Sequence, residues 1–232
     1  MNQFIKILME YSRKYENEVN DQILDAKPVK SNSISKLIDD TFNSHHDVWL
    51  MTDWHLFKYD KNTKAVYHNP RFNNIITNCQ RYIKPNDLLI FLGDICDGEV
   101  ERKKDIESAL ANIPGVKILI RGNNDLFDDS WYLKNGFKYI VPKFVYNDIL
   151  FTHRPQDNDY SINIHGHIHG SARYYASEIT HYNNQIDVAY FNGREIPIKL
   201  NDIINKLPEY KKKVVFVDKA WKDDPRIDGQ PS

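Results

Sequence analysis

Short apolar runs recur along the middle of the chain, and each has the length of one buried strand. The four runs are Val48 to Met51, Leu88 to Leu92, Val116 to Ile120 and Ile149 to Phe151. Because they are nearly continuous in apolar residues, they predict strands that are buried on both faces of a sheet. Stretches near 71 to 83 and 99 to 112 favour helices between these strands. The pattern therefore predicts an α/β unit over residues 46 to 200.

The two ends of the chain carry other patterns. In residues 1 to 45, apolar positions near helical spacing predict an amphipathic helix, and a second short helix follows the capping region Ser31 to Ser33. An apolar helical stripe usually faces its own core, so we expect this N-terminal helical extension to pack on the sheet and not to bind a partner. Residues 201 to 232 predict a short helix, a strand at Val214 to Val217 and a mobile polar tail.

One strand pair carries a turn signal. Ile186 to Phe191 and Glu195 to Leu200 alternate between apolar and polar residues on either side of Asn192-Gly193. The Asn-Gly pair suits the tight turn of a two-residue hairpin loop. The sequence therefore predicts a β-hairpin here.

Composition narrows the class of protein. A chain of 232 residues can bury a substantial core as one domain, and its formal net charge of −1 argues against a generic nucleic-acid-coating surface. Apolar stretches are too short to span a membrane, and the first residues do not have the pattern of a signal peptide. Two cysteines, Cys79 and Cys96, do not make a disulfide framework. These features predict a cytoplasmic protein.

Side chains that bind metals follow the predicted strands in order. They are Asp53, His55, Asp94, Asn123, His153, His167 and His169. Alternate residues of an extended segment point the same way, so Asp53 with His55, and His167 with His169, can converge as the chain leaves a strand. Gly93 and Gly122 suit sharp turns where the backbone approaches an ion. Oxygen and imidazole donors without thiolates favour divalent manganese, iron or zinc, so the pattern predicts a dinuclear site at the strand ends.

Each block also has an ordinary structural interpretation. Asp-x-His occurs by chance in many loops, Gly-Asp and Asn-Asn-Asp are common in turns, and a lone histidine such as His153 often lines the edge of a core. The three histidines at 165, 167 and 169 are harder to explain by packing, because protonated imidazoles this close would repel each other. The complete ordered set favours the metal site.

The ordered blocks D-x-H, GD, GN-x-D, H and GHxH resemble those of the calcineurin-like metallophosphoesterase superfamily. The resemblance runs from about Val48 to about Lys199, and IRGNND, LFTHRP and NIHGHIHG are most similar to its small bacterial and phage phosphoesterases. It implies a four-layer α/β/β/α sandwich and two divalent ions, manganese first and iron, zinc or nickel as alternatives. By position, it implies that one ion is held by Asp53, His55 and His169, the other by Asn123, His153 and His167, and that Asp94 bridges them.

The implied activity is hydrolysis of a phosphate ester, either a small molecule or a nucleotide, because paired ions can activate water and neutralise phosphate charge. The sequence departs from the family at Asn124, where most members carry a histidine that assists the leaving group. Asparagine cannot donate a proton in this way. Loss of acid assistance costs about two to four orders of magnitude on poor leaving groups, so the sequence favours phosphodiesters over alkyl phosphomonoesters.

Three further residues are candidates for roles near the substrate. Arg154 could present a planar fork to a phosphate, or could simply be solvated. Arg121 is expected to pair with a local carboxylate. His68 is the nearest later histidine to Asp-x-His and could replace the missing acid, although a loop histidine without supporting spacing is more often unrelated to catalysis.

Two other functions stay open. A eukaryotic branch of the superfamily uses a degenerate metal site as an interaction scaffold; the seven retained ligand positions argue against that here, and Asn124 argues for it. A nuclease would need a basic, aromatic-lined groove. The residues that could line such a groove, or equally cap the core, are Trp54, Tyr59, Tyr67, Arg71 and Phe72.

Overall fold

The computed structural model describes residues 32–57, 72–96, 102–156, 158–169, 185–189 and 194–205, and the backbone of 59–60 and 65–66. The helix predicted before residue 32, the strand predicted at Val214 to Val217, and His68 lie outside these residues. No helix in the described part of the chain is long and apolar enough to cross a membrane.

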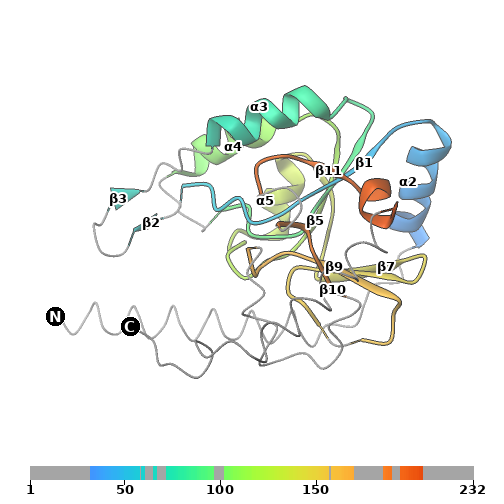
Figure 1. Cartoon of the computed structure of the whole chain (residues 1–232). Helices are drawn as coiled ribbons and strands as arrows, with labels where there is room; N and C mark the ends of the chain where they lie inside the picture. Colours follow the sequence, from blue (N-terminus) through green and yellow to red (C-terminus); the bar gives the residue numbers. More distant parts are fainter. Residues whose placement is uncertain are drawn as a thin grey trace, which may run out of the picture.

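Two sheets packed face to face carry the fold (Figure 1). The larger sheet has the order β11 (Ile198–Lys199), β1 (Val48–Met51), β4 (Leu88–Phe91), β5 (Val116–Ile120) and β6 (Phe137–Val141). The second has the order β10 (Gln185–Asp187), β9 (Ile162–His165), β8 (Ile149–Thr152) and β7 (Lys143–Tyr146). Strands β1, β4, β5 and β6 are parallel, and β11 joins them antiparallel. A separate pair is formed by β2 (Tyr59–Asp60) and β3 (Ala65–Val66).

Alternate side chains of the central strands enter two different cores. In β1, Val48 and Leu50 join the core between the two sheets, whereas Trp49 and Met51 join the core under the helices. Successive side chains of a strand point to opposite faces, so a strand covered on both faces needs apolar residues at nearly every position. The continuous apolar runs of the sequence are explained by this double burial.

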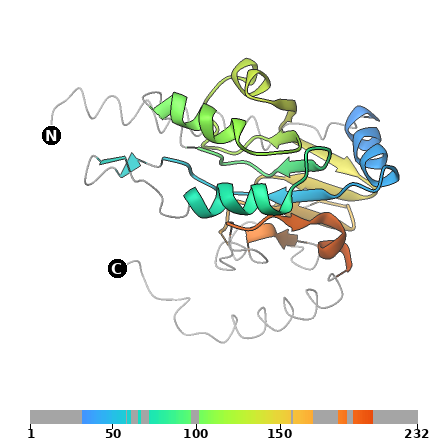
Figure 2. The same cartoon turned by 90° about the horizontal axis from the view of Figure 1, so that it is seen from above.

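Helices flank the sheets (Figures 1 and 2). The outer face of the larger sheet is covered by α3 (Phe72–Tyr82), α4 (Lys103–Ala111) and α5 (Asp129–Lys134). Helix α2 (Asn32–Asn43) instead places Ile34 and Ile38 in the core that the two sheets share. The predicted α/β architecture of two packed sheets with flanking helices is therefore confirmed. The helix whose apolar stripe predicted packing on the sheet lies before residue 32, outside the described residues.

The predicted β-hairpin around Asn192-Gly193 is wrong. Strand β10 pairs in parallel with β9, whereas β11 pairs antiparallel with β1 of the other sheet. An isolated two-stranded hairpin buries little apolar surface. Each segment instead extends the edge of a different sheet, where Ile186 and Leu200 reach the shared core. Asn192 and Gly193 themselves lie outside the described residues.

Asp87 ties the beginning of β1 to the loop before β4. Its carboxylate accepts hydrogen bonds from the Lys84 N–H (2.9 Å), the Trp49 indole N–H (2.9 Å) and the Asp47 N–H (3.1 Å). Burial raises the pKa of Asp87, but these hydrogen bonds outweigh that effect, and the pKa lies below its ordinary value. The ionised carboxylate therefore stabilises the folded state.

We expect Asp87→Asn to lower the free energy of unfolding by about 1–3 kcal/mol at pH 7, because buried donors lose a charged acceptor. A lowered folded-state pKa gives stability that is present above the unfolded-state value of about 3.9 and is lost as the pH falls through the folded-state value. The difference in free energy of unfolding between Asp87→Asn and the unmodified protein should therefore become smaller below about pH 4. Urea unfolding of the metal-free proteins at pH 7, 4 and 3 measures it; a difference that is as large at pH 3 as at pH 7 would contradict the assignment.

Candidate metal centre

The ends of the strands bring six side chains into two adjacent groups. One contains Asp53, His55 and His169, and the other contains Asp94, His153 and His167. In each group, the potential ligand atoms lie within 4.8 Å of one another. Asp53 and His55 follow β1, Asp94 follows β4, His153 follows β8, and the last two histidines follow β9. Sequence reasoning placed these residues at one site, and the structure brings them together there.

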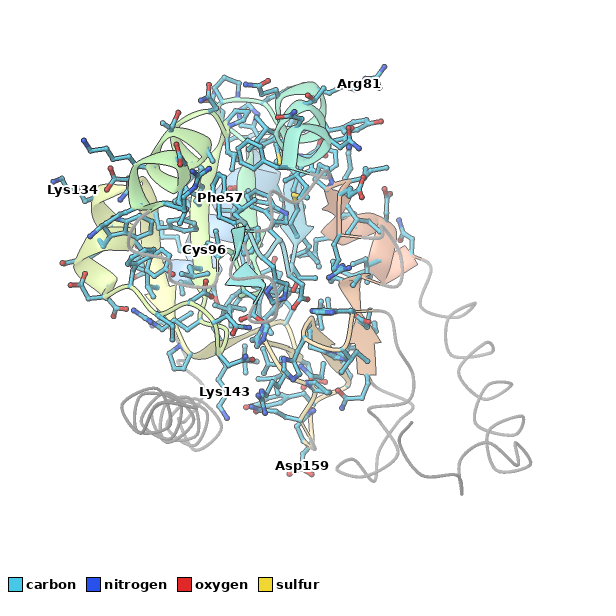
Figure 3. All side chains as sticks on the ribbon, turned by 90° about the vertical axis from the view of Figure 1, so that its left-hand side faces the viewer. Phe57, Arg81, Cys96, Lys134, Lys143 and Asp159 are labelled. Carbon is cyan, nitrogen blue, oxygen red and sulfur yellow. The ribbon has the colours of Figure 1, made fainter. Side chains whose placement is uncertain are left out.

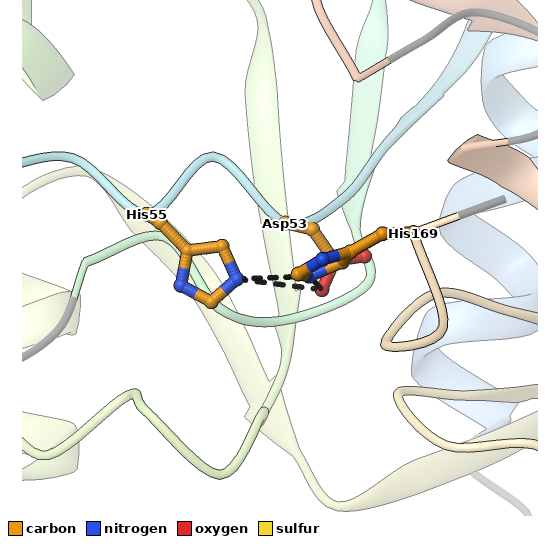
Figure 4. A group of neighbouring side chains, drawn as sticks. All are labelled: Asp53, His55 and His169. Atoms are coloured by element: carbon orange, nitrogen blue, oxygen red, sulfur yellow. Dashed lines mark hydrogen bonds and ion pairs between the residues drawn. The ribbon is translucent and has the colours of Figure 1, made fainter. Parts of the chain in front are cut away.

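The first group has the spacing of ligands around one ion (Figure 4). The Nε2 atoms of His55 and His169 are 3.1 Å apart, and Asp53 Oδ1 is 3.3 Å from His169 Nε2 and 3.9 Å from His55 Nε2. Two ligands that each lie about 2.1 Å from an ion, at roughly 90–109° to each other, are about 3.0–3.4 Å apart. The three side chains could therefore hold a divalent ion with little movement.

The second group has similar spacing and shares a carboxylate with the first. His153 Nε2 lies 3.1 Å from His167 Nδ1, 3.1 Å from Asn123 Oδ1 and 3.4 Å from Asp94 Oδ2. The same Asp94 oxygen is 3.6 Å from His55 Nε2. Asp94 therefore faces both groups.

The hydrogen bonds of Asp53 leave one of its carboxylate oxygens available to a cation. Its Oδ2 atom accepts hydrogen bonds from the Thr52 hydroxyl (2.6 Å) and the His167 N–H (2.8 Å). Its Oδ1 atom is fully buried and accepts no hydrogen bond. A buried carboxylate oxygen without a partner is costly, and a cation between Asp53, His55 and His169 would remove that cost. The residues present therefore fit a divalent metal ion.

The orientation of His153 is also suited to metal binding. Its Nδ1 atom lies 2.7 Å from the Leu92 carbonyl oxygen. A carbonyl can only accept, so Nδ1 carries a proton, and Nε2 faces Asp94 and His167, where it can bind an ion once it is deprotonated. Fixing the tautomer through the second ring nitrogen is common for histidines that bind metals.

Five of the candidate ligands have left-handed backbone conformations. The φ angles are 54° at Asp53, 47° at His55, 60° at Asp94, 70° at His167 and 53° at His169. Such conformations cost about 1–3 kcal/mol each outside glycine, and they concentrate at functional sites. The predicted convergence of Asp53 with His55 is confirmed, but its expected cause is wrong. The side chains converge through left-handed turns beyond the strand, and not through strand alternation.

Two glycines allow the loops to approach each other. Gly93 has a φ of 86°, and a Cβ there would lie 2.6 Å from both Gly122 N and His153 Nδ1. At Gly122 the backbone is not left-handed, but a Cβ would collide with Asp94 Oδ1 and lie 2.5 Å from Asp94 N. Both glycines are therefore needed for close packing of the ligand loops, and the expected approach of their backbone to an ion stays a prediction.

A comparison with known proteins identifies the family. The sequence model of the calcineurin-like phosphoesterases matches residues 46–228. The chain belongs to this family. No curated protein matches the sequence. Both ligand groups lie within the matched region, at the blocks D-x-H, GD, H and GHxH of this sequence.

Two solved structures are similar to this one. The protein of unknown function AQ665 from Aquifex aeolicus has a TM-score of 0.50 and 22% identity, covering 69% of this chain and 98% of that one. The nuclease MPE from Pseudomonas putida has a TM-score of 0.37 and 19% identity, covering 53% of this chain and 61% of that one. The likeness to AQ665 supports the fold alone.

The other residues singled out in the sequence have different outcomes. Arg121 pairs with Asp129 at 2.7 Å, which confirms a local carboxylate partner. Arg154 is half-buried beside His153, and its charge lowers the pKa of His167, so it lies near the second group. Trp54 is 1% exposed and packs edge-on against Phe91 with 4.5 Å between ring centroids, so it caps the core and cannot line a groove.

Sequence reasoning missed residues that hold the ligands in place. Thr52 orients Asp53, and the carboxylate of Asp125 accepts hydrogen bonds from the backbone N–H groups of Asp94, Ile95 and Gly122. Burial and the charge of Asp94 raise the pKa of Asp125 to about 6. Apart from its place in the Gly-Asn-Asn-Asp block, no sequence signal distinguishes Asp125 from an ordinary turn residue.

The site is open to solvent on one side. His169 is 38% exposed and His167 is half-buried, whereas the other side chains of the two groups are buried. Figure 3 views the molecule from the side where Phe57 and Cys96, which follow the loops after β1 and β4, lie near the centre. Arg81 of α3 lies on one side of them, and Lys143 of β7 lies on the other. A substrate could therefore approach from the side of His167 and His169.

Protonation of the site depends on its two carboxylates. Burial raises the pKa of Asp94, but the charge of His153 and its hydrogen bond outweigh this and hold the pKa well below its ordinary value. Burial lowers the pKa of His153, but Asp94 outweighs it and raises the pKa to about 9. Burial and then the charge of His153 lower the pKa of His167 to about 3. Without an ion, His153 is therefore protonated at neutral pH and His167 is neutral.

We expect metal binding at pH 7 to release about one proton, because a ligand imidazole must be neutral. That proton comes from His153, whose pKa is about 9 in the metal-free protein. The affinity for Mn²⁺ should accordingly rise with pH up to about 9, because a smaller fraction of His153 is then protonated. Calorimetric titration with Mn²⁺ in buffers of different ionisation enthalpy measures the release. Binding heats that are the same in every buffer would contradict this protonation state.

Proposed function

We propose that the protein hydrolyses phosphate esters with two divalent ions, and that it favours phosphodiesters over alkyl phosphomonoesters. The observation that supports this most strongly is the pair of ligand groups that share Asp94. Membership of the calcineurin-like phosphoesterases supports the same reaction class.

In this proposal, Asp53, His55 and His169 hold one ion, Asn123, His153 and His167 hold the other, and Asp94 contacts both. Mixed oxygen and nitrogen donors without thiolates suit manganese, with iron, zinc or nickel as alternatives. The ions would supply Lewis-acid activation of water and neutralisation of phosphate charge.

The protein side chains orient the ligands and the substrate. Thr52 and the N–H of His167 fix one oxygen of Asp53 and direct the other toward His55 and His169. Arg154 carries a planar guanidinium suited to two phosphate oxygens, and the effect of its charge on the pKa of His167 supports a location near the second group. We propose Arg154 as the residue that orients the phosphate.

The preference for diesters follows from residue 124. An asparagine amide can donate a hydrogen bond, but it is not acidic enough to transfer a proton to a departing alkoxide. Esters with poor leaving groups lose about 10²–10⁴-fold when such help is absent, whereas aryl leaving groups depart without it. His68, outside the described residues, stays a candidate for this help.

The assay that tests the proposal compares a bis(aryl) phosphate, a dinucleotide and an alkyl phosphomonoester on Mn²⁺-reconstituted protein. We expect turnover of at least one diester, with the monoester slower. Metal binding without turnover of any substrate would favour the interaction scaffold, and turnover of the dinucleotide alone would favour a nuclease.

We expect Asp94→Asn to weaken both metal sites, because Asp94 Oδ2 faces both groups, and to abolish hydrolysis. His169→Ala, in contrast, should weaken mainly the site of Asp53 and His55. Mass spectrometry of bound metal after dialysis measures both, with circular dichroism as the control for folding. Full occupancy of both metal sites in Asp94→Asn would contradict the assignment of Asp94 as a shared ligand.

Asn124→His should raise activity on an alkyl phosphomonoester more than on a bis(aryl) diester, because only the former needs help for its leaving group. The ratio of the two rates matters, since the change at residue 124 also alters contacts to Asp94. Steady-state rates at saturating Mn²⁺ give the ratio for both proteins. If the ratio does not change, residue 124 does not set substrate choice.

A further inference from the structure

Both carboxylate oxygens of Asp94 are bound by one residue, Asn124. The backbone N–H of Asn124 donates to Asp94 Oδ1 at 2.9 Å, and its side-chain amide donates to Oδ2 at 2.7 Å. The donors are 30 residues away from Asp94 in sequence. The side chain of Asn124 is therefore directed at a candidate ligand.

The turn that carries Asn124 also holds the backbone of Asp94. Asp125 Oδ2 accepts hydrogen bonds from the N–H groups of Asp94 (2.9 Å) and Gly122 (2.8 Å), and Asp125 Oδ1 accepts one from Ile95 (3.0 Å). The absence of a Cβ at Gly122 leaves room for Asp94 Oδ1. The turn at 122–125 therefore surrounds Asp94 on its main chain and on its side chain.

These contacts fix which oxygen faces the two ligand groups. Oδ2, which Asn124 binds through its amide, lies 3.6 Å from His55 Nε2 and 3.4 Å from His153 Nε2. A carboxylate offers about four lone-pair directions, so two donors leave capacity for metal ions. Rotation of the Asp94 carboxylate would break both hydrogen bonds to Asn124.

The amide also suits the charge of the site. Asp94 is 1% exposed and Asp53 is fully buried, and one carboxylate oxygen of each lies within 3.9 Å of His55 Nε2. Two buried carboxylates repel each other, and hydrogen-bond donors that carry no charge relieve part of the cost without repelling a cation. An amide meets that need.

We propose that Asn124 is a positioning residue, which pre-organises Asp94 for both ions and is not a contact to the leaving group. This inference rests on the proposed two-ion function. It assigns residue 124 a different role from the histidine that most members of the family carry there. Substituting Asn124 should therefore change metal affinity first and substrate affinity second.

The test is calorimetric titration of metal-free proteins with Mn²⁺. Removing a residue that orients a metal ligand typically costs about 10–100-fold in metal affinity, and we expect this loss for both ions in Asn124→Ala. Asn124→Ser, whose side chain is polar but shorter, should show a similar loss and serves if the alanine variant does not fold. Asn73→Ala is the matched control, because Asn73 is exposed on α3, and it should bind as the unmodified protein does.

Comparing the Mn²⁺ requirement with KM distinguishes a residue that positions a metal ligand from a residue that contacts the substrate. For a positioning residue, the Mn²⁺ concentration needed for half-maximal diester hydrolysis rises in Asn124→Ala, while KM at saturating Mn²⁺ changes little. Unchanged or tighter Mn²⁺ binding together with a raised KM would overturn the inference and leave the proposed function standing. Unmodified protein that binds no Mn²⁺ would overturn both.

Discussion

The fold is constrained by two buried carboxylates that must lie at one place. Asp53 and Asp94 follow neighbouring parallel strands, and hydrogen bonds between the loops continue beyond the strands, from Asp53 N–H to the Gly93 carbonyl and from His55 N–H to the Asp94 carbonyl, both at 3.0 Å. This pairing holds two buried like charges close together. The unpartnered oxygen of Asp53 and the raised pKa of His153 both follow from that arrangement, since each carboxylate needs a nearby positive charge.

Packing elsewhere in the fold keeps the strained backbone of the site in place. Left-handed backbone at five candidate ligands is unfavourable, and it persists only where the surrounding structure fixes the loops. The central strands are buried on both faces, in the core between the sheets and in the core under the helices. Rigid strands on either side therefore determine where each ligand loop begins, and the loops have little freedom to relax.

The two groups differ in how their ligands are held. His153 is fixed by the Leu92 carbonyl, and Asp94 by the turn at 122–125, so the second group is enclosed by hydrogen bonds. His169 in the first group is exposed. We expect exchange of ions and access of substrate to occur from the side of His169, because movement there breaks fewer buried contacts.

The sequence by itself determined the four apolar strands β1, β4, β5 and β8, the helices α3 and α4, and the residues that gather at the candidate metal centre. These are local or ordered signals: apolar runs report double burial, and ligand blocks after strands report a site at the sheet edge. The tertiary structure alone decided that β10 and β11 belong to different sheets, that Asp53 and His55 converge through left-handed turns, and that Asn124 binds Asp94. Each of these depends on contacts between segments far apart in the chain, whose energies outweigh a local turn signal or strand alternation and leave no mark in the residues themselves.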